Sequence, residues 1–211
     1  MTVDTFDEIA DERRALADQL ASLTPEQQAT RSLCDAWTVH DVAAHLVMPL
    51  EVSVPRVVLA VLLAGGRFDR ANERVTRGLA RRSFAEIVEV LDRKAHSRFT
   101  PPGSGPEAPL VDVLVHGLDI RWPLQLHRDV PEPRLRKALT FLMTAPSGLV
   151  PTGALAGLRL EATDIDWAHG DGPVVSGAAP ALLLASTGRA AGLDALTGEG
   201  VAVLRGRLGP G

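Results

Sequence analysis

Hydrophobic residues recur every three or four positions through the first half of the chain, which is the spacing of helices with one buried face. Between residues 5 and 23 this spacing predicts a helix of about five turns, and Thr5 with Glu8 has the form of a capping box at its start. A short second helix is predicted after the N-cap residue Thr24, because Pro25 occupies the first helical position, and a turn at 32–36 follows it.

The signal for a helix N-terminus is stronger at Thr38. Its side chain can cap a helix, and Asp41, three residues on, completes a capping box. The prolines Pro49 and Pro55 are expected to kink or divide this helix. The apolar run beyond them indicates that helix resumes until the glycine pair at 65–66 ends it.

The pattern repeats over 83–99, with Ser83 and Glu86 as another capping box, and again over 110–118, where Pro123 is expected to stop the helix. A Pro/Gly/Ser loop separates these two helices. Residues 1–128 are therefore predicted to form a bundle of about four core helices.

The remaining residues, 129–211, contain segments with the helical spacing and segments in which apolar and polar residues alternate as in a strand. They therefore predict a small α+β domain. The sequence here predicts, in order, a helix at 134–143, a strand at 158–163, a turn at 169–172, a returning strand at 173–176, a helix at 181–196 and a closing strand at 201–205. The expected fold class is therefore a two-domain α+β protein.

Composition narrows the functional classes. The chain has 211 residues with 22 Lys+Arg against 26 Asp+Glu, and its net charge of −4 argues against bulk nucleic acid and anionic membranes as partners. The longest strictly apolar run, 57–64, is too short to span a bilayer. An acidic N-terminus without a secretory signal pattern and a single cysteine favour the cytoplasm.

The segment 110–120 contains the most informative polar pattern, because its only ionisable residues are Asp112, His116 and Asp119. Spacings of four and three place them in one stripe on an otherwise largely apolar helix. A buried stripe of this kind costs several kcal/mol unless something compensates its charge. A divalent cation would do so.

Asp112 and His116, one turn apart, could bind the same ion, while Asp119 accepts a hydrogen bond from the other ring nitrogen of His116. His45, on the helix that follows Thr38, offers a third ligand. Two histidines and one carboxylate with an open position form the ligand set of a catalytic metal site. Two other interpretations stay open: Asp112 and His116 as a buried ion pair, and His45 as a core or cap residue.

Cys34, just ahead of a predicted helix N-terminus, is either an activated thiol or an ordinary buried hydrophobic residue. The remaining histidines are expected to be solvated; they are His40, His96, His127 and His169.

Two segments resemble a known family. Residues 34–46, CDAWTVHDVAAHL, resemble the W-[ST]-V-x-D-V-x-x-H-L signature of the mycothiol-dependent maleylpyruvate isomerase N-terminal domain, a DinB-like four-helix bundle. Residues 112–124, DVLVHGLDIRWPL, resemble its second metal-binding segment. The tail over 158–208 resembles the sterol-carrier-like C-terminal domain of many members.

This resemblance implies a divalent metal, usually zinc, bound by His45, Asp112 and His116, with mycothiol or a similar thiol as cosubstrate. The isomerase has Glu where this chain has Asp112, so the carboxylate here is one methylene shorter. An Arg of the C-terminal domain contributes to activity in the isomerase, and Arg189 is the matching candidate here.

Three functional hypotheses follow. The first is a metal-dependent enzyme in which a thiol adds to a small electrophilic substrate for transfer or isomerisation, with Asp119 orienting His116. The second is a non-catalytic, metal-stabilised module whose tail binds an apolar ligand or a partner. The third is a thiol-independent, metal-assisted hydrolase.

Overall fold

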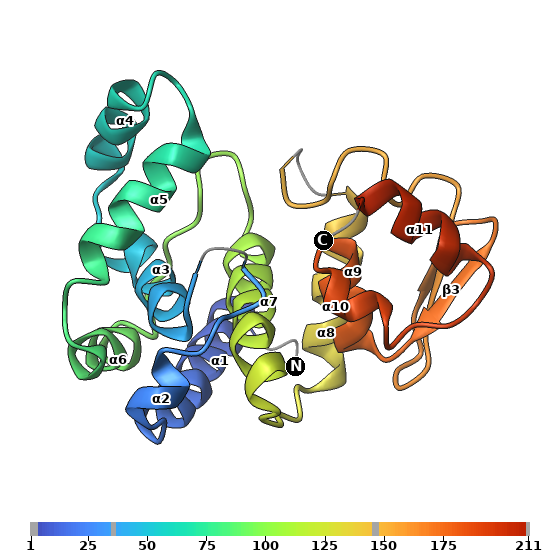
Figure 1. Cartoon of the computed structure of the whole chain (residues 1–211), viewed down its shortest axis with the longest axis horizontal. Helices are drawn as coiled ribbons and strands as arrows, with labels where there is room; N and C mark the ends of the chain where they lie inside the picture. Colours follow the sequence, from blue (N-terminus) through green and yellow to red (C-terminus); the bar gives the residue numbers. More distant parts are fainter. Residues whose placement is uncertain (1–3, 35–36, 145–147, 210–211) are drawn as a thin grey trace. The chain divides into compact units, whose positions relative to one another are not determined.

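The computed structural model describes residues 4–34, 37–144 and 148–209, and over these the chain is a mostly helical α+β protein with one three-stranded sheet (Figure 1). The chain divides into two compact units, one ending at Leu126 and the other beginning at His127. No helix within the described ranges is long and apolar enough to cross a membrane.

The first unit is helical throughout its described elements. Its helices are α1 (Thr5–Ala21), α2 (Pro25–Gln28), α3 (Val39–Glu51), α4 (Val54–Leu63), α5 (Phe68–Leu79), α6 (Phe84–Arg93) and α7 (Glu107–Leu124).

Most of these helices begin at the capping residues that the sequence predicts. The boxes at Thr38 and Ser83 are both complete, each with reciprocal side-chain to backbone hydrogen bonds. The start of α1 differs from the prediction, because the N-cap is Asp4, whose carboxylate accepts from the Phe6 amide. Thr5 is thus the first helical residue rather than the cap.

The predicted division of the helix after Thr38 is confirmed near Pro55: α3 ends before Val52, and Pro55 occupies the first turn of α4, while Pro49 lies inside α3. Two other features differ from the prediction. Helix α5 was not predicted, since five of its twelve residues are charged and its buried residues are only Ala71 and Thr76. Pro123 lies inside the last turn of α7, which ends only where Gln125 adopts a left-handed φ of 54°. The predicted turn at 32–36 includes residues 35 and 36, which lie outside the described ranges.

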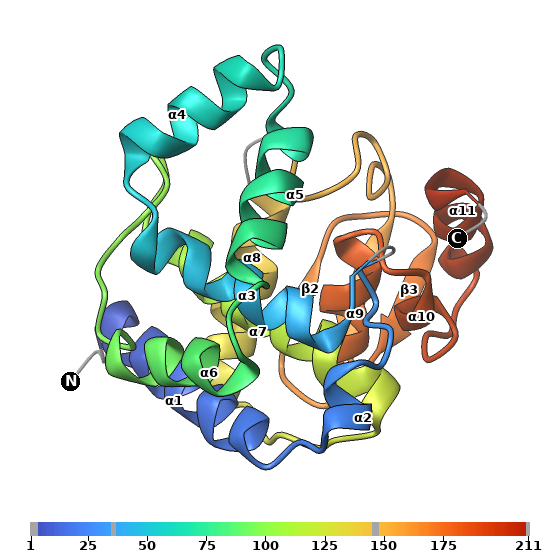
Figure 2. The ribbon, with the colours of Figure 1, turned by 60° about the vertical axis from the view of Figure 1, so that its left-hand side comes forward.

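One hydrophobic core unites the first unit. Helix α1 packs against α6 and α7, and α3 packs against α5, α6 and α7, an arrangement visible in Figure 2. The largest side chains with almost no exposure in this core include Leu16, Leu20, Ile87, Leu91 and Ile120. Helices α3 and α7, on which the predicted ligands lie, are therefore direct neighbours.

The second unit combines helices with a small sheet. Its elements are α8 (Glu132–Thr144), β1 (Arg159–Ala162), β2 (Ala168–His169), β3 (Val174–Gly177), α9 (Ala179–Ser186), α10 (Ala190–Leu193) and α11 (Gly200–Leu208). Helix α9 is buried on nearly all sides and packs against α8 and α10. The Trp167 indole donates to the Thr140 hydroxyl at 3.0 Å, tying the sheet region to α8.

The sheet corrects the predicted returning strand. Its order is β2-β1-β3, and β3 pairs parallel with β1 while β2 pairs antiparallel on the other side. The two glycines of the predicted turn allow the backbone to pass close to residues 157–158. A Cβ at Gly170 would overlap the carbonyl oxygen of Leu158, and a Cβ at Gly172 would overlap that of Gly157. Both glycines also have positive φ.

Two further predictions for this unit are wrong in detail. The closing strand expected at 201–205 is part of α11, because a short apolar run does not distinguish strand from helix and here Leu204, on the packed side, is the buried residue of that run. The helix expected at 181–196 is divided into α9 and α10, since Gly188 has a φ of +85° that ends α9.

Candidate metal centre

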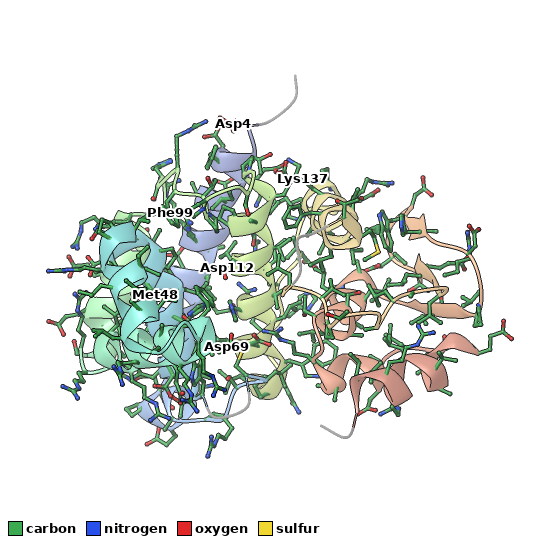
Figure 3. The ribbon with its side chains drawn as sticks, turned by 90° about the horizontal axis from the view of Figure 1, so that it is seen from above. Asp4, Met48, Asp69, Phe99, Asp112 and Lys137 are labelled. Carbon is green, nitrogen blue, oxygen red and sulfur yellow. The ribbon has the colours of Figure 1, made fainter. Side chains whose placement is uncertain are left out.

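Three predicted ligands from two helices meet within the first unit. The Asp112 Oδ1 atom lies 3.8 Å from His45 Nε2 and 3.6 Å from His116 Nε2. The two imidazole rings are 4.7 Å apart at their centroids and nearly perpendicular. Figure 3 labels Asp112 on α7, with Met48 and Asp69 marking α3 and α5.

The spacing of these atoms fits a shared cation better than direct hydrogen bonds. Nitrogen–oxygen distances of 3.6 and 3.8 Å exceed hydrogen-bond length. Two ligands bound at about 2.1 Å to one tetrahedral ion lie about 3.4 Å apart. Three such ligand atoms within 4.8 Å of one another therefore form a donor set that a divalent cation could occupy.

Local structure explains how His45 reaches this position. The Thr38 capping box fixes the start of α3, and His45 lies two turns later on the side facing α7. The neighbouring Ala43 and Ala44 are fully buried, so α3 and α7 can approach closely at this level. His45 is only 9 % exposed, and its Nδ1 has no hydrogen-bond partner among the described residues.

Asp119 supports His116 from the buried side of α7. Its Oδ2 lies 2.9 Å from His116 Nδ1, the contact predicted from the i, i+3 spacing, and the Asp119 side chain has no exposed surface. If Nδ1 carries the ring proton, Nε2 presents its lone pair toward Asp112.

Cys34 also contacts this group of residues. Its Sγ donates to Asp119 Oδ2 at 3.0 Å and lies 3.7 Å from His116 Nδ1. The amide of Leu33 donates to the Asp119 carbonyl oxygen at 3.1 Å, which fastens this loop to α7. Cys34 thus forms part of the polar cluster, a role that the sequence left undecided. The one indication in the sequence was that Cys34 is the first residue of the segment 34–46, which resembles the isomerase family.

The electrostatics favour a positive charge at this position. Burial lowers the pKa of His116, but the contacts with Asp119 and Cys34 and the charge of Asp112 outweigh it and raise the pKa to about 10. Partial burial raises the pKa of Asp112, yet the proximity of His45 and the charges of His116 and Arg13 bring it below its usual value. In the metal-free chain the cluster therefore retains a proton that a cation would displace.

Arg13 is a second residue that the sequence did not single out. It is buried on α1 and donates to the carbonyl oxygens of Ala95 and Ser97 at 3.0 and 2.9 Å. Burial lowers its pKa and the nearby Asp112 opposes that shift, so its charge acts on the site. No periodic pattern identifies such a residue, because its partners are backbone atoms more than 80 positions away.

The other predicted residues are not among the converging ligand groups. Arg189, half-buried in the second unit, donates to the Thr187 carbonyl oxygen at 2.8 Å. His96, His127 and His169 are exposed as expected. His40 is not solvated as expected, because its ring packs edge-on against Phe84 and its Nε2 is buried.

The fold and these ligand groups define an α+β protein whose helical unit has a candidate metal site between two adjacent helices. The family model described as the mycothiol maleylpyruvate isomerase N-terminal domain matches residues 9–121, more than half of the chain. The chain belongs to this family, and the match includes all three candidate ligands and Asp119.

Two solved structures are similar to the chain. A crystal structure of the mycothiol-dependent maleylpyruvate isomerase has 19 % identity and a TM-score of 0.59, covering 94 % of this chain and 96 % of that one. A histidine-to-alanine mutant of that enzyme has 18 % identity and a TM-score of 0.56, with the same coverage. At this identity the likeness shows the fold. A comparison with curated proteins finds no match.

Proposed function

We propose that the protein is a metal-dependent enzyme that uses a mycothiol-type thiol for transfer or isomerisation of a small electrophilic substrate. One observation carries the proposal: the ligand atoms of His45, Asp112 and His116 converge, and the Asp112 side chain remains 36 % exposed. A purely structural metal site is normally closed by four protein ligands. A three-ligand set that reaches solvent leaves room for an exogenous ligand.

The proposed metal is zinc. Imidazole and carboxylate are ligands that zinc accepts, and three of them with one open position are typical of its catalytic sites. When bound, such an ion lowers the pKa of a thiol or water molecule at the open position. The family membership and the solved isomerase support mycothiol as the source of that thiol.

Three residues that do not bind the metal are proposed to support the site or the reaction. Asp119 fixes the tautomer and the ring orientation of His116 through the 2.9 Å contact. Arg13 partly balances the negative charge of Asp112, which lessens the cost of a carboxylate in a largely apolar helix bundle. Arg189 is proposed to contribute to catalysis from the second unit, on the basis of the family resemblance alone.

We propose that residues 1–128 form a DinB-like four-helix bundle, with α1, α3, α6 and α7 as its core helices, and that residues 129–211 form a sterol-carrier-like domain. The mutual packing of those four helices supports the first assignment. The helices and three-stranded sheet of the second unit support the second. A cytoplasmic location fits the sequence composition.

The metal is tested by elemental analysis of protein purified without an affinity tag. We expect about one equivalent of zinc in the wild type and little in His116→Ala. His127→Ala is the matched control, because His127 is 84 % exposed and is not one of the converging ligand groups. Absence of metal in the wild type, or undiminished metal in His116→Ala, would overturn the proposal.

The thiol is tested separately on cobalt-substituted protein. Titration with mycothiol should change the visible absorption spectrum, since a sulfur ligand alters the field at the ion. An unchanged spectrum combined with a sharp loss of thermal stability on chelation would favour the non-catalytic module instead. An unchanged spectrum with hydrolytic activity on ester or amide substrates would favour the metal-assisted hydrolase.

A further inference from the structure

Helix α4 and the start of α5 expose an unusual number of large hydrophobic side chains. We call this the α4–α5 surface, and its apolar residues are Val54 (41 % exposed), Val58 (51 %), Leu59 (55 %), Leu62 (69 %), Leu63 (68 %) and Phe68 (57 %). Six of the eight large hydrophobic residues that are exposed in the described chain lie in this one segment. Figures 1 and 2 both show α4 at the edge of the first unit, beside α5.

The exposure follows from the helix geometry. At 100° per residue, Val54, Val58 and Leu62 form one row, with Leu59 and Leu63 beside it, and this row faces solvent. The opposite side, with Val57 and Ala60, is partly buried, and α4 packs against α5. No residue of α4 is fully buried. The helix is thus apolar on the side where a surface helix is normally polar.

Positive charge is concentrated in the same segment of the chain. Between Glu51 and Arg82 the sequence has seven Arg against three acidic residues, a net charge of +4 in a chain of net charge −4. Two of these arginines are paired, Arg77 with Glu73 and Arg82 with Glu51. The other five are exposed and form no ion pair within the described ranges; they are Arg56, Arg67, Arg70, Arg74 and Arg81.

A second copy of the chain fits this surface poorly. With about 150–200 Å² for a fully exposed apolar residue, the six residues expose about 600 Å², so the apolar area alone does not exclude a dimer. The charge does, because pairing the segment with its own copy would bring arginines against arginines, which opposes association. The complementary partner is both apolar and anionic.

We propose that the α4–α5 surface docks the protein onto an anionic phospholipid surface. The row of Val and Leu on α4, with Phe68, enters the boundary between headgroups and acyl chains, and the unpaired arginines contact lipid phosphates. The overall charge of −4 predicts no membrane partner, but only charges within about 10 Å of the lipid act strongly on it. The proposal is independent of the metal site and of the proposed enzymatic function.

Vesicle flotation tests this proposal with the full chain. Wild-type protein should bind vesicles of phosphatidylcholine with about 30 mol % phosphatidylglycerol at least tenfold more tightly than pure phosphatidylcholine vesicles, and added salt should weaken the binding. The Leu62→Glu, Leu63→Glu double variant should lose this binding. Its matched control is Leu149→Glu with Val203→Glu, two residues that are each 39 % exposed outside the surface.

A charge variant separates the two components of the surface. Arg70→Gln with Arg74→Gln should weaken binding to the anionic vesicles about tenfold or more. Arg93→Gln with Arg136→Gln removes the same charge elsewhere and should leave binding unchanged, while circular dichroism confirms that every variant is folded. Absence of binding, equal binding to both vesicle types, or a dimer in light scattering that Leu62→Glu, Leu63→Glu dissolves would each overturn the proposal.

Discussion

Replacement of Asp119 by asparagine isolates the support that this residue gives to His116. The substitution keeps the shape of the side chain but removes the negative charge 2.9 Å from His116 Nδ1, and the amide can turn its NH₂ group toward the ring. The His116 ring then loses its fixed tautomer and part of its basicity as a ligand. None of the candidate ligands is itself altered.

The structure sets the expected magnitude. Asp119 has no exposed surface, so water cannot replace the lost acceptor, whereas the Asp112 and His45 groups remain in place. Loss of such a support weakens metal affinity by about 10- to 100-fold, or about 1.4–2.7 kcal/mol. Competition with a chromophoric zinc chelator measures this change directly.

The chain has a matched control for this experiment. His127 and Asp129 form a pair of similar length, 2.8 Å, with both side chains more than 80 % exposed. Asp129→Asn should leave zinc affinity unchanged. If Asp119→Asn binds zinc within about twofold of the wild type while remaining folded, Asp119 does not orient a metal ligand and the assignment of the site is wrong.

Two further predictions concern the charges around the site. Because the pKa of His116 is raised to about 10, the metal-free ring keeps a proton that zinc must displace on binding. The apparent zinc affinity should therefore rise about tenfold per pH unit between about pH 6 and 8. Calorimetry in buffers of different ionisation enthalpy should detect the release of about one proton. Affinity that is constant over this range would contradict the prediction. Arg13→Leu leaves the Ala95 and Ser97 carbonyl oxygens without their donor and should destabilise the protein by about 2–4 kcal/mol in urea unfolding, whereas Arg93→Leu, which removes an exposed i, i+4 pair on α6, should cost less than about 0.5 kcal/mol. Equal effects of the two variants would show that the Arg13 contacts contribute no more than a surface pair.

Short-range chemistry explains what was predictable from the sequence. The capping boxes at Thr38 and Ser83 involve residues three apart, so their hydrogen bonds can be inferred without knowledge of the fold. The stripe of Asp112, His116 and Asp119 is likewise a property of one helix, and the contact between His116 and Asp119 followed from its spacing.

Local patterns failed where two conformations compete at similar cost. The run at 201–205 satisfies both strand and helix, and its packing against the rest of the second unit selects the helix. The direction of β3 depends on which edge of β1 is available, and a turn-like sequence does not specify that edge.

By itself, the sequence determined the helical character of the first unit, the positions of its caps and the carboxylate and imidazole types of the candidate ligands, because each depends on residues within one or two turns. Only the tertiary structure decided that His45 lies beside Asp112 and His116, that Cys34 and Arg13 join the same cluster, and that α4 leaves an apolar face exposed. These features join positions far apart in the chain, and the packing of helices, rather than any local propensity, brings them together.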